Sequence, residues 1–437
     1  MAESGVIYLL WNDLVGVTRT RGVPLSEFDR RLDAGLGWAM AGQALTAFED
    51  IVENVWGPMD EARQIPDPDA RFTIPENDDH PAVHGVICDS KRSLDEDWPA
   101  CARTFFRHAL AELKSETGLD LVTAFEHEFS VAGEGFSPRT PFSFAAAREQ
   151  HGLLCDLEAA LSAVGVAPET IEPEFGVAQY EVSCGPKPGL HGADSAVIVR
   201  ETIREVARRR GLEASLTPKP APDAVGNGCH IHLSFADADG TNVTQDPDGP
   251  MELSPVAAGF AAGILAHAEA LVAITAPTPV SYHRLGPHHW SCGFRAIGVQ
   301  NREATVRVVP GIARGADAAR RRFNIEYRPV DATASPYLAL GALVHAGLYG
   351  IRNGLALPKP AEMDPADMTD AELAEHDIVP LPDTLGGALD KLEADATLRA
   401  CFPDDILNTF LALKRWECRF AAENDEAHVF ARYRSAY

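Results

Sequence analysis

Basic residues are scarce in this sequence. Its 437 residues include 38 Lys and Arg against 64 Asp and Glu, which gives a formal net charge of −26. A surface so acidic repels the phosphate backbone of nucleic acids and the headgroups of an anionic membrane. We therefore exclude both classes of partner and attribute the acidity to solubility or a salty environment.

The eight cysteines form no CxxC pair and no spacing typical of a zinc site. We expect reduced thiols and a cytoplasmic protein. Residues 1–8 lack a positively charged region followed by an apolar run, so no export signal is predicted. Long apolar runs are few: 256–276 is interrupted by His267 and Glu269, and 336–351 is short for a membrane span. Both are expected to be buried helices.

The chain is longer than one ordinary domain, and its 46% hydrophobic residues suffice for a sizeable core. We expect two domains, residues 1–95 and 96–437. In the first, the patterns predict strands at 6–11, 72–75 and 82–88, a helix at 25–36 and a Pro- and Asp-rich loop at 65–70. In the second, strands alternate with helices at 98–117, 151–164, 194–210, 389–398 and 405–423, and another helix starts at Ser254-Pro255.

The stretch Ala124-Phe-Glu-His-Glu-Phe129 has the pattern of a strand that carries two acids on one face. Side chains alternate along a strand, so Glu126 and Glu128 share a face while His127 points to the other side. Two carboxylates so close repel each other unless a cation lies beside them or one keeps its proton. The simpler alternative is an edge strand with a solvated acidic face.

Other segments place polar side chains on one face in the same way. Their residues are His230, His232 and Ser234; Asn324, Glu326 and Arg328; Arg302 and Arg307; and Glu174 and Glu181. If these segments are neighbours in one sheet, they form a cavity rimmed by arginines and lined by Glu126, Glu128, Glu174, Glu181, Glu326 and His230.

Five carboxylates and one imidazole suit hard divalent cations such as Mg²⁺ or Mn²⁺ better than zinc, because oxygen donors dominate. Arginines beside them indicate recognition of phosphate or carboxylate groups, which the guanidinium binds bidentately. Metal ions and arginines around one cavity are the arrangement that phosphoryl transfer needs.

Five segments together resemble the glutamine synthetase superfamily in order and spacing: 124–129, 174–181, 226–234, 301–307 and 325–338. The resemblance covers nearly the whole chain. It implies an α+β protein with a small N-terminal β-grasp domain and a C-terminal catalytic domain built on a curved antiparallel sheet. It also implies a dodecamer of two stacked hexameric rings, in which the N-terminal domain of a neighbouring subunit completes each active site.

The resemblance also implies residue roles. Two or three Mg²⁺ or Mn²⁺ ions would bind, the first to Glu128, Glu174 and Glu181 and the second to Glu126, His230 and Glu326. Arg302, Arg307 and Arg328 would be catalytic. Arg284, Arg328 and the loop at Gly226 would hold glutamate, and His232, Ser234 and Arg307 would lie on the nucleotide side. ATP would phosphorylate the γ-carboxylate of glutamate, and a nitrogen nucleophile would then displace the phosphate.

Two departures from the family pattern concern the nitrogen substrate. In ammonia-using members a glutamate follows the motif that here reads Arg284-Leu-Gly-Pro-His-His289, and this chain has Trp290 instead. A second acid of the ammonium pocket is replaced by Ala39, next to Trp38. We infer a pocket for a larger amine, as in the γ-glutamylamide ligase branch, with Trp290, Ala39 and Trp38 lining it. Val225 replaces a further asparagine, which leaves the identity of the acid substrate open.

Each interpretation has an alternative. His232 alone would be a structural histidine, Arg302 a surface ion-pair residue and Trp290 a core residue. Three functions remain open: a glutamate–amine ligase, glutamine synthetase proper, and a non-enzymatic assembly protein of the same family.

Overall fold

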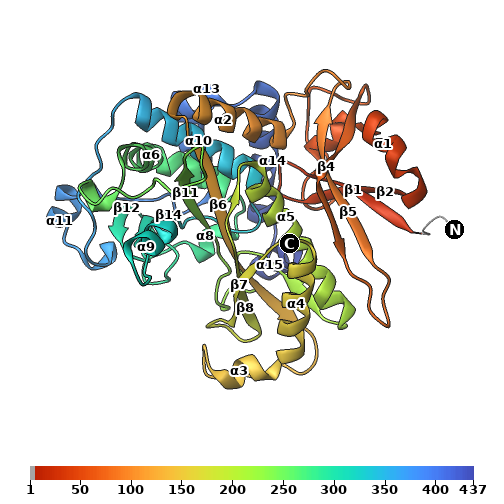
Figure 1. Cartoon of the computed structure of the whole chain (residues 1–437), viewed down its shortest axis with the longest axis horizontal. Helices are drawn as coiled ribbons and strands as arrows, with labels where there is room; N and C mark the ends of the chain where they lie inside the picture. The colour runs from red at the N-terminus through yellow and green to blue at the C-terminus, as the bar shows by residue number, and fades with distance from the viewer. Residues whose placement is uncertain (1–4) are drawn as a thin grey trace.

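The computed structural model describes residues 5–437, so part of the stretch for which no export signal is predicted lies outside the described residues. The N-terminal part forms a five-stranded sheet in the order β2-β1-β5-β4-β3 (Figure 1). Its elements are β1 Val6–Asn12, β2 Thr18–Pro24, α1 Phe28–Ala34, β3 Leu36–Ala39, β4 Glu61–Ile74 and β5 Val83–Lys91. Strands β1 and β5 are parallel and the other pairs are antiparallel.

One local prediction for this domain is wrong, and another is confirmed with shorter bounds. The predicted loop at 65–70 lies within β4, whose pairing with β5 shifts register between Pro66 and Arg71. Proline lacks the N–H of a ladder hydrogen bond, and a bulge accommodates it without ending the strand. The predicted helix at 25–36 is shorter, because a 3₁₀ turn precedes α1 and Gly35, at a φ of +57°, ends it.

The C-terminal part is built on a larger sheet in the order β15-β12-β13-β14-β11-β6-β8-β7, with β9 and β10 also paired to β6. The strands are β6 Asp120–Ala132, β7 Pro168–Pro173, β8 Gln179–Cys184, β9 Lys187–Pro188, β10 Glu213–Ser215, β11 Cys229–Ala236, β12 Phe294–Val299, β13 Ala304–Val309, β14 Asn324–Tyr327 and β15 Val379–Pro380. Within this larger sheet, only the β12–β13 pair is parallel among the described strands. A small domain beside a larger one with a curled, mainly antiparallel sheet confirms the predicted α+β fold class.

Helices cover one face of this sheet, and α2 and α5 pack on β6 (Figure 1). The helices are α2 Ala102–Thr117, α3 Phe144–Glu149, α4 His151–Ala163, α5 Leu190–Arg209, α6 Pro255–Ala266, α7 Ala268–Thr275, α8 Ser281–Arg284, α9 Ala316–Arg322, α10 Pro336–Arg352, α11 Asp370–Glu375, α12 Leu385–Ala394, α13 Ala396–Cys401, α14 Asp404–Glu423 and α15 Glu426–Ala436. The helix predicted from residue 98 begins at Ala102.

Two predicted helices are each divided into two shorter helices, and the residues at the two breaks contact each other. The run 256–276 is divided into α6 and α7 at His267, with a bend of 81°. The helix predicted at 389–398 is divided into α12 and α13 at Asp395, which also caps α13 by accepting from the N–H of Leu398. His267 Nδ1 lies 2.6 Å from Asp395 Oδ2. This tertiary contact between polar side chains explains why helical periodicity alone does not locate either break.

The apolar helices are buried, as predicted, and α10 has most of its residues in the core. Within residues 5–437, no single helix is both long and apolar enough to cross a membrane. The pair α6 and α7 reaches that length and composition together, but the pair is sharply bent. All eight cysteines have free thiols.

A buried ion network joins the two parts of the chain. Arg103 at the start of α2 bonds Asp67 and Asp89 of the N-terminal sheet and Asp194 of α5, at 2.6 to 3.0 Å. Charges this deeply buried are tolerated only when they are paired.

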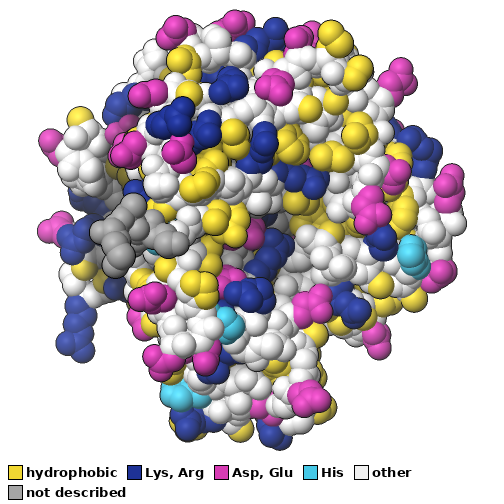
Figure 2. Space-filling view, turned by 90° about the vertical axis from the view of Figure 1, so that its right-hand side faces the viewer, with side chains coloured by type: hydrophobic (Ala, Val, Ile, Leu, Met, Phe, Trp, Pro, Cys, Tyr) yellow, Lys and Arg dark blue, Asp and Glu magenta, His cyan; other side chains and the backbone are white. Residues whose placement is uncertain are grey.

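On the face seen in Figure 2, acidic and basic side chains are interspersed rather than gathered into one patch of either sign.

Candidate active site

The two acids of the ExE strand lie in the interior of the large sheet. They belong to β6, which pairs with β11 on one side and β8 on the other, so the edge-strand interpretation is wrong. Phe125, His127 and Phe129 point into the core, with no more than 5% of each exposed. Glu126 and Glu128 therefore project from the opposite face of the strand.

Strand register brings the predicted residues of five strands together. Directly opposed pairs are Glu126 with His230, Glu128 with Glu181, and Glu326 with both His232 and Arg307. Directly opposed side chains lie on the same face of a sheet. The expectation that these segments are neighbours in one sheet is confirmed for β6, β8, β11, β13 and β14.

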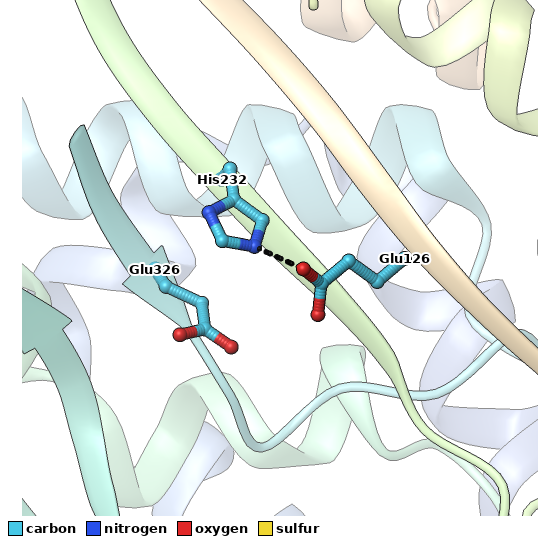
Figure 3. A group of neighbouring side chains, drawn as sticks. All are labelled: Glu126, His232 and Glu326. Atoms are coloured by element: carbon cyan, nitrogen blue, oxygen red, sulfur yellow. Dashed lines mark ion pairs between the residues drawn. The ribbon is translucent and has the colours of Figure 1, made fainter. Parts of the chain in front are cut away.

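The two histidines of β11 both contact the acidic group. His230 Nδ1 lies 3.4 Å from Glu126, 3.7 Å from Glu326 and 4.0 Å from Glu128. His232 Nε2 lies 3.0 Å from Glu126, as Figure 3 shows. One ligand atom each from Glu126, His232 and Glu326 lie within 4.8 Å of one another. The structure thus places His232, assigned from the sequence to the nucleotide side, as near to the candidate metal ligands as His230.

Each histidine has one ring nitrogen that forms no hydrogen bond within residues 5–437, although His232 Nε2 lies at ion-pair distance from Glu126. The two atoms, His230 Nδ1 and His232 Nε2, are buried. The Nδ1 of His232 lies 2.8 Å from Oδ1 of Asn324. That contact fixes the orientation of the ring and leaves Nε2 directed at the carboxylates, as the hydrogen-bond partners of metal-binding histidines do.

Glu181 and Glu174 are crowded by other carboxylates. Burial and the nearby Glu126 and Glu128 raise the pKa of Glu181 to about 9. Burial and Glu128 raise the pKa of Glu174 to about 7. Glu174 follows β7 directly and lies in the turn to β8 rather than on a strand. Carboxylates that resist ionisation together are stabilised by a shared divalent cation, so the donor set fits Mg²⁺ or Mn²⁺.

Neighbouring charges also shift the pKa values of Glu126 and of the two histidines. Burial opposes the charge of Glu126, but His230 and His232 outweigh it and hold its pKa low. Burial likewise opposes the charge of the His232 ring, while Glu126 and Glu326 raise its pKa to about 9. Burial and the nearby Arg328 lower the pKa of His230. The two adjacent histidines therefore differ in charge at neutral pH.

Arg307 and Arg328 both bond the fully buried Glu326. Arg307 Nη1 donates to Glu326 Oε2 at 2.8 Å, and Arg328 Nη1 donates to Glu326 Oε1. Arg302 is exposed in the turn before β13, and its carbonyl accepts from Arg328 Nε at 2.8 Å. The net pKa of Glu174 is raised, and the positive charge of Arg302 acts weakly against that rise. Arg302 forms no ion pair among residues 5–437 within 4.0 Å, so its predicted role stays a prediction.

Arg284 is buried against the glycines of the loop before β11. Its Nη2 lies 3.4 Å from His230 Nε2. A Cβ on Gly226 would come within 2.7 Å of Arg284 Cγ, and a Cβ on Gly228 within 2.7 Å of Arg284 Nη2. Gly228 N–H also donates to Glu128 Oε2 at 2.9 Å. The loop therefore needs glycine so that its backbone can approach both the arginine and the carboxylate.

Ser234 lies two residues after His232 on β11, opposite Val122, on the same face and half-buried. It is farther along the strand from Glu126 than His232 is. Its predicted place on the nucleotide side is compatible with this position and stays a prediction.

Trp290 lies in the loop between α8 and β12, with 62% of its side chain surface exposed, so the core-packing interpretation is wrong. Its backbone is held at both ends. Trp290 N–H donates to Glu303 Oε1 at 2.7 Å, and its carbonyl accepts from Arg328 Nη2 at 2.7 Å. Its φ is +52°, an uncommon conformation for a bulky residue. The loop is thus attached to Arg328, one of the residues predicted to be catalytic.

Trp38 and Ala39 lie on β3 of the N-terminal domain. The Trp38 ring packs edge-on against Trp11 of the same domain, with centroids 4.7 Å apart, and Ala39 is exposed. That they form one amine pocket with Trp290 stays a prediction.

Sequence reasoning missed several residues of the site. Asn324 orients His232, Glu303 holds Trp290, and Gln179 Nε2 donates to the Gly226 carbonyl at 2.7 Å. Asn324 was noted only as a polar residue of its strand. Glu303 lies in a turn, where no periodicity identifies it, and only its acidity beside Arg302 could have drawn attention.

Comparison with known proteins identifies the family of the chain. The family model "Glutamine synthetase, catalytic domain" matches residues 99–433, and "Glutamine synthetase N-terminal domain" matches residues 2–95. Gamma-glutamylpolyamine synthetase GlnA3 of Streptomyces coelicolor is 34% identical over 99% of this chain and 93% of its own. Glutamine synthetase of Methanocaldococcus jannaschii is 31% identical over 86% of this chain and 82% of its own.

Comparison with solved structures leads to the same family. A crystal structure of a novel glutamine synthase homolog superposes with a TM-score of 0.91 at 38% identity, and covers 100% of this chain and 99% of that one. A complex of GmaS with ADP superposes with a TM-score of 0.82 at 26% identity, and covers 96% of this chain and 94% of that one. The chain belongs to the glutamine synthetase family and is a ligase of that family.

Proposed function

We propose that the protein is an ATP-dependent ligase that joins the γ-carboxylate of glutamate to an amine through a γ-glutamyl phosphate intermediate. The observation that carries this proposal is the contrast between a full set of acidic and arginine side chains and an exposed Trp290 where ammonia-using members have an acid. The polyamine ligase activity in the name of the Streptomyces relative supports it.

Two or three Mg²⁺ or Mn²⁺ ions would be held by Glu128, Glu174 and Glu181 and by Glu126, His230 and Glu326. When bound, such ions neutralise negative charge on ATP and on the transferred phosphate. The contact of His232 with Glu126 makes it a further candidate ligand, in addition to its predicted role near the nucleotide.

The arginines of the site would position the transferred phosphate and the glutamate. Arg307 and Arg328 are held by the same carboxylate, so their guanidinium groups are fixed before substrate binds. Arg302 and Arg307 would hold the transferred phosphate, and Arg284, Arg328 and the Gly226 loop would hold glutamate. Fixed charges lower the barrier because they need no reorganisation during the reaction. A carboxylate becomes a good electrophile only once phosphorylation turns its oxygen into a leaving group.

Trp290 would favour an amine with a carbon skeleton. Its exposed ring offers apolar surface, and an aromatic face also attracts an ammonium group. Trp38 and Ala39 would contribute from the N-terminal domain of a neighbouring subunit. Exposed apolar side chains in that domain, at Ile51, Val55 and Met59, are suited to contact between subunits.

We further propose a cytoplasmic dodecamer of two hexameric rings, with the domains divided at residues 95 and 96. The second candidate function is glutamine synthetase proper, which the name of the Methanocaldococcus relative favours. A non-enzymatic assembly is disfavoured, because the acidic group and its arginines are complete.

The test is phosphate release from ATP with glutamate, Mg²⁺ and a set of amines that includes ammonium. We expect alkylamines to have a higher kcat/KM than ammonium. Ammonium as the best nucleophile would establish the second candidate. Turnover with no amine, and with no alternative acid in place of glutamate, would favour the non-enzymatic assembly.

A further inference from the structure

Glu303 is a buried acid with one oxygen engaged and one free. It lies in the turn before β13 with 6% of its surface exposed. Oε1 accepts the N–H of Trp290 at 2.7 Å. Oε2 is buried and has no hydrogen-bond partner among residues 5–437. A buried carboxylate oxygen without a partner is costly, and in native proteins such an atom calls for an explanation.

Glu303 is connected through Trp290 to Arg328, one of the residues predicted to be catalytic. Glu303 bonds the N–H of Trp290 and Arg328 bonds its carbonyl, so the carboxylate and the guanidinium approach the same residue from its two ends. Asp364 is close enough for its charge to raise the pKa of Glu303, to which burial contributes most. Asp364 itself lies 3.0 Å from His288 Nδ1. Arg328 and His288 act on the pKa of Glu303 in the opposite direction, so Glu303 and Asp364 are two carboxylates that share this neighbourhood with basic groups.

A hydrogen-bond donor is the partner that Glu303 Oε2 lacks among residues 5–437, and a positively charged donor would also balance the carboxylate charge. ATP and its products are anions, and the amine substrate of the proposed ligase is a cation at neutral pH. The two acids that attract ammonium in ammonia-using members are replaced here by Trp290 and Ala39. Glu303 comes from a different segment and supplies a carboxylate next to one of those replaced positions.

We propose that Glu303 is the carboxylate that binds the positively charged nitrogen of the amine substrate, through Oε2, beside the ring of Trp290. The inference rests on the proposed ligase function and specifies its substrate class as primary alkylamines that are protonated in solution. Oε1 keeps the loop in place while Oε2 receives the ammonium in a charge-assisted hydrogen bond.

The test is Glu303→Gln. Glutamine keeps an oxygen that accepts the N–H of Trp290, so the loop stays attached while the charge is lost. The measured quantity is kcat/KM for butylamine divided by kcat/KM for hydroxylamine, a nucleophile that is uncharged at neutral pH. We expect this ratio to fall at least about thirtyfold, mainly through the KM of butylamine, because a charge-assisted bond contributes about 2 kcal/mol. Asp367 is an exposed acid whose Oδ1 lies 4.0 Å from His288 Nε2. Asp367→Asn should change the ratio less than about twofold.

An unchanged ratio in Glu303→Gln would mean that Glu303 only holds the loop, and would overturn the proposal. So would a rise in the KM of glutamate in place of that of butylamine, because Glu303 would then bind the α-ammonium group. If the wild-type enzyme uses no amine at all, the proposed function itself fails. A crystal structure of the wild-type protein with butylammonium gives a test without any variant. We expect its nitrogen within hydrogen-bond distance of Oε2, and a nitrogen elsewhere in the site would contradict the inference.

Discussion

The acidic face of the large sheet and the loop at Trp290 are built in opposite ways. On the sheet, register sets which residues face each other, and Glu326 and His230 are almost fully buried. In the loop, His288, Trp290 and Cys292 all have positive φ values, and the loop is held by a few hydrogen bonds from Glu303 and Arg328. Under the proposed function, the metal and phosphate chemistry would lie where the geometry is fixed, and the choice of nitrogen substrate would lie where the geometry can change.

The difference has a physical basis. A strand residue cannot move to another face without shifting the whole strand by one position, which would also expose the core residues. A loop residue can be exchanged at the cost of its own contacts only. Substitutions on the sheet should therefore affect every nucleophile alike, and substitutions in the loop should change the preference among them.

The largest effect is expected on the sheet. Glu326→Gln removes the charge that pairs with both Arg307 and Arg328 and takes away a candidate metal ligand. We expect kcat/KM to fall about 10³-fold for all amines and for hydroxylamine alike. Phosphate release measures this. Glu213→Gln on β10, an exposed glutamate of the same sheet, serves as the control and should retain activity within about twofold. A loss limited to one nucleophile would contradict the division between the two regions.

Metal binding should depend strongly on pH. Glu174 and Glu181, with pKa values raised to about 7 and about 9, hold protons below those values. A divalent cation needs them ionised, so binding releases protons. Mn²⁺ affinity should therefore increase with pH up to about 9, by about 100-fold over two pH units if one proton is released. Calorimetry in two buffers with different heats of ionisation measures the protons released. Affinity independent of pH would remove these two acids from the ligand set.

In the loop, Trp290→Glu should change the preference among nitrogen nucleophiles rather than abolish the ligase activity. A carboxylate beside Arg328 restores the charge that attracts a small cation. We expect kcat/KM for ammonium to rise about tenfold and that for butylamine to fall. His289→Glu places the same charge one residue earlier and should give no gain. If both variants behave alike, Trp290 does not line the nitrogen site.

The smallest effect concerns a residue that orients a side chain. Asn324→Ala removes the 2.8 Å contact to His232 Nδ1, and the ring gains freedom to turn. The KM of ATP should rise about fivefold, the equivalent of one hydrogen bond, with amine preference unchanged. Asn353→Ala, at the exposed end of α10, is the matched control. A shift in amine preference would show that the two regions are coupled through His232.

The parts of the molecule that follow local periodicity were predictable. Alternation along β6 and β11 placed Glu126, Glu128, His230 and His232 on one face, and the structure confirms this. The spacing could not show that His232 is as close to Glu126 as His230 is, because that depends on the ring orientation set by Asn324.

Features that depend on contacts between distant segments were not predictable. The helix breaks at His267 and Asp395 are joined by a bond between residues 128 positions apart. The bulge in β4 absorbs prolines that by themselves indicate a loop. Glu303 accepts a hydrogen bond from Trp290, 13 residues earlier in the chain. The loop that contains Trp290 has no periodic pattern from which this contact could be predicted.

The most direct test of the account is a competition between nucleophiles. Wild-type protein with ATP, glutamate and Mg²⁺ is given ammonium and butylamine at equal concentration, and mass spectrometry measures glutamine and γ-glutamylbutylamide. The account predicts that the amide exceeds glutamine by at least about tenfold, since the ring of Trp290 and the carboxylate of Glu303 favour an alkylammonium ion. Glutamine as the main product would contradict the claim that this loop has exchanged ammonia for a larger amine.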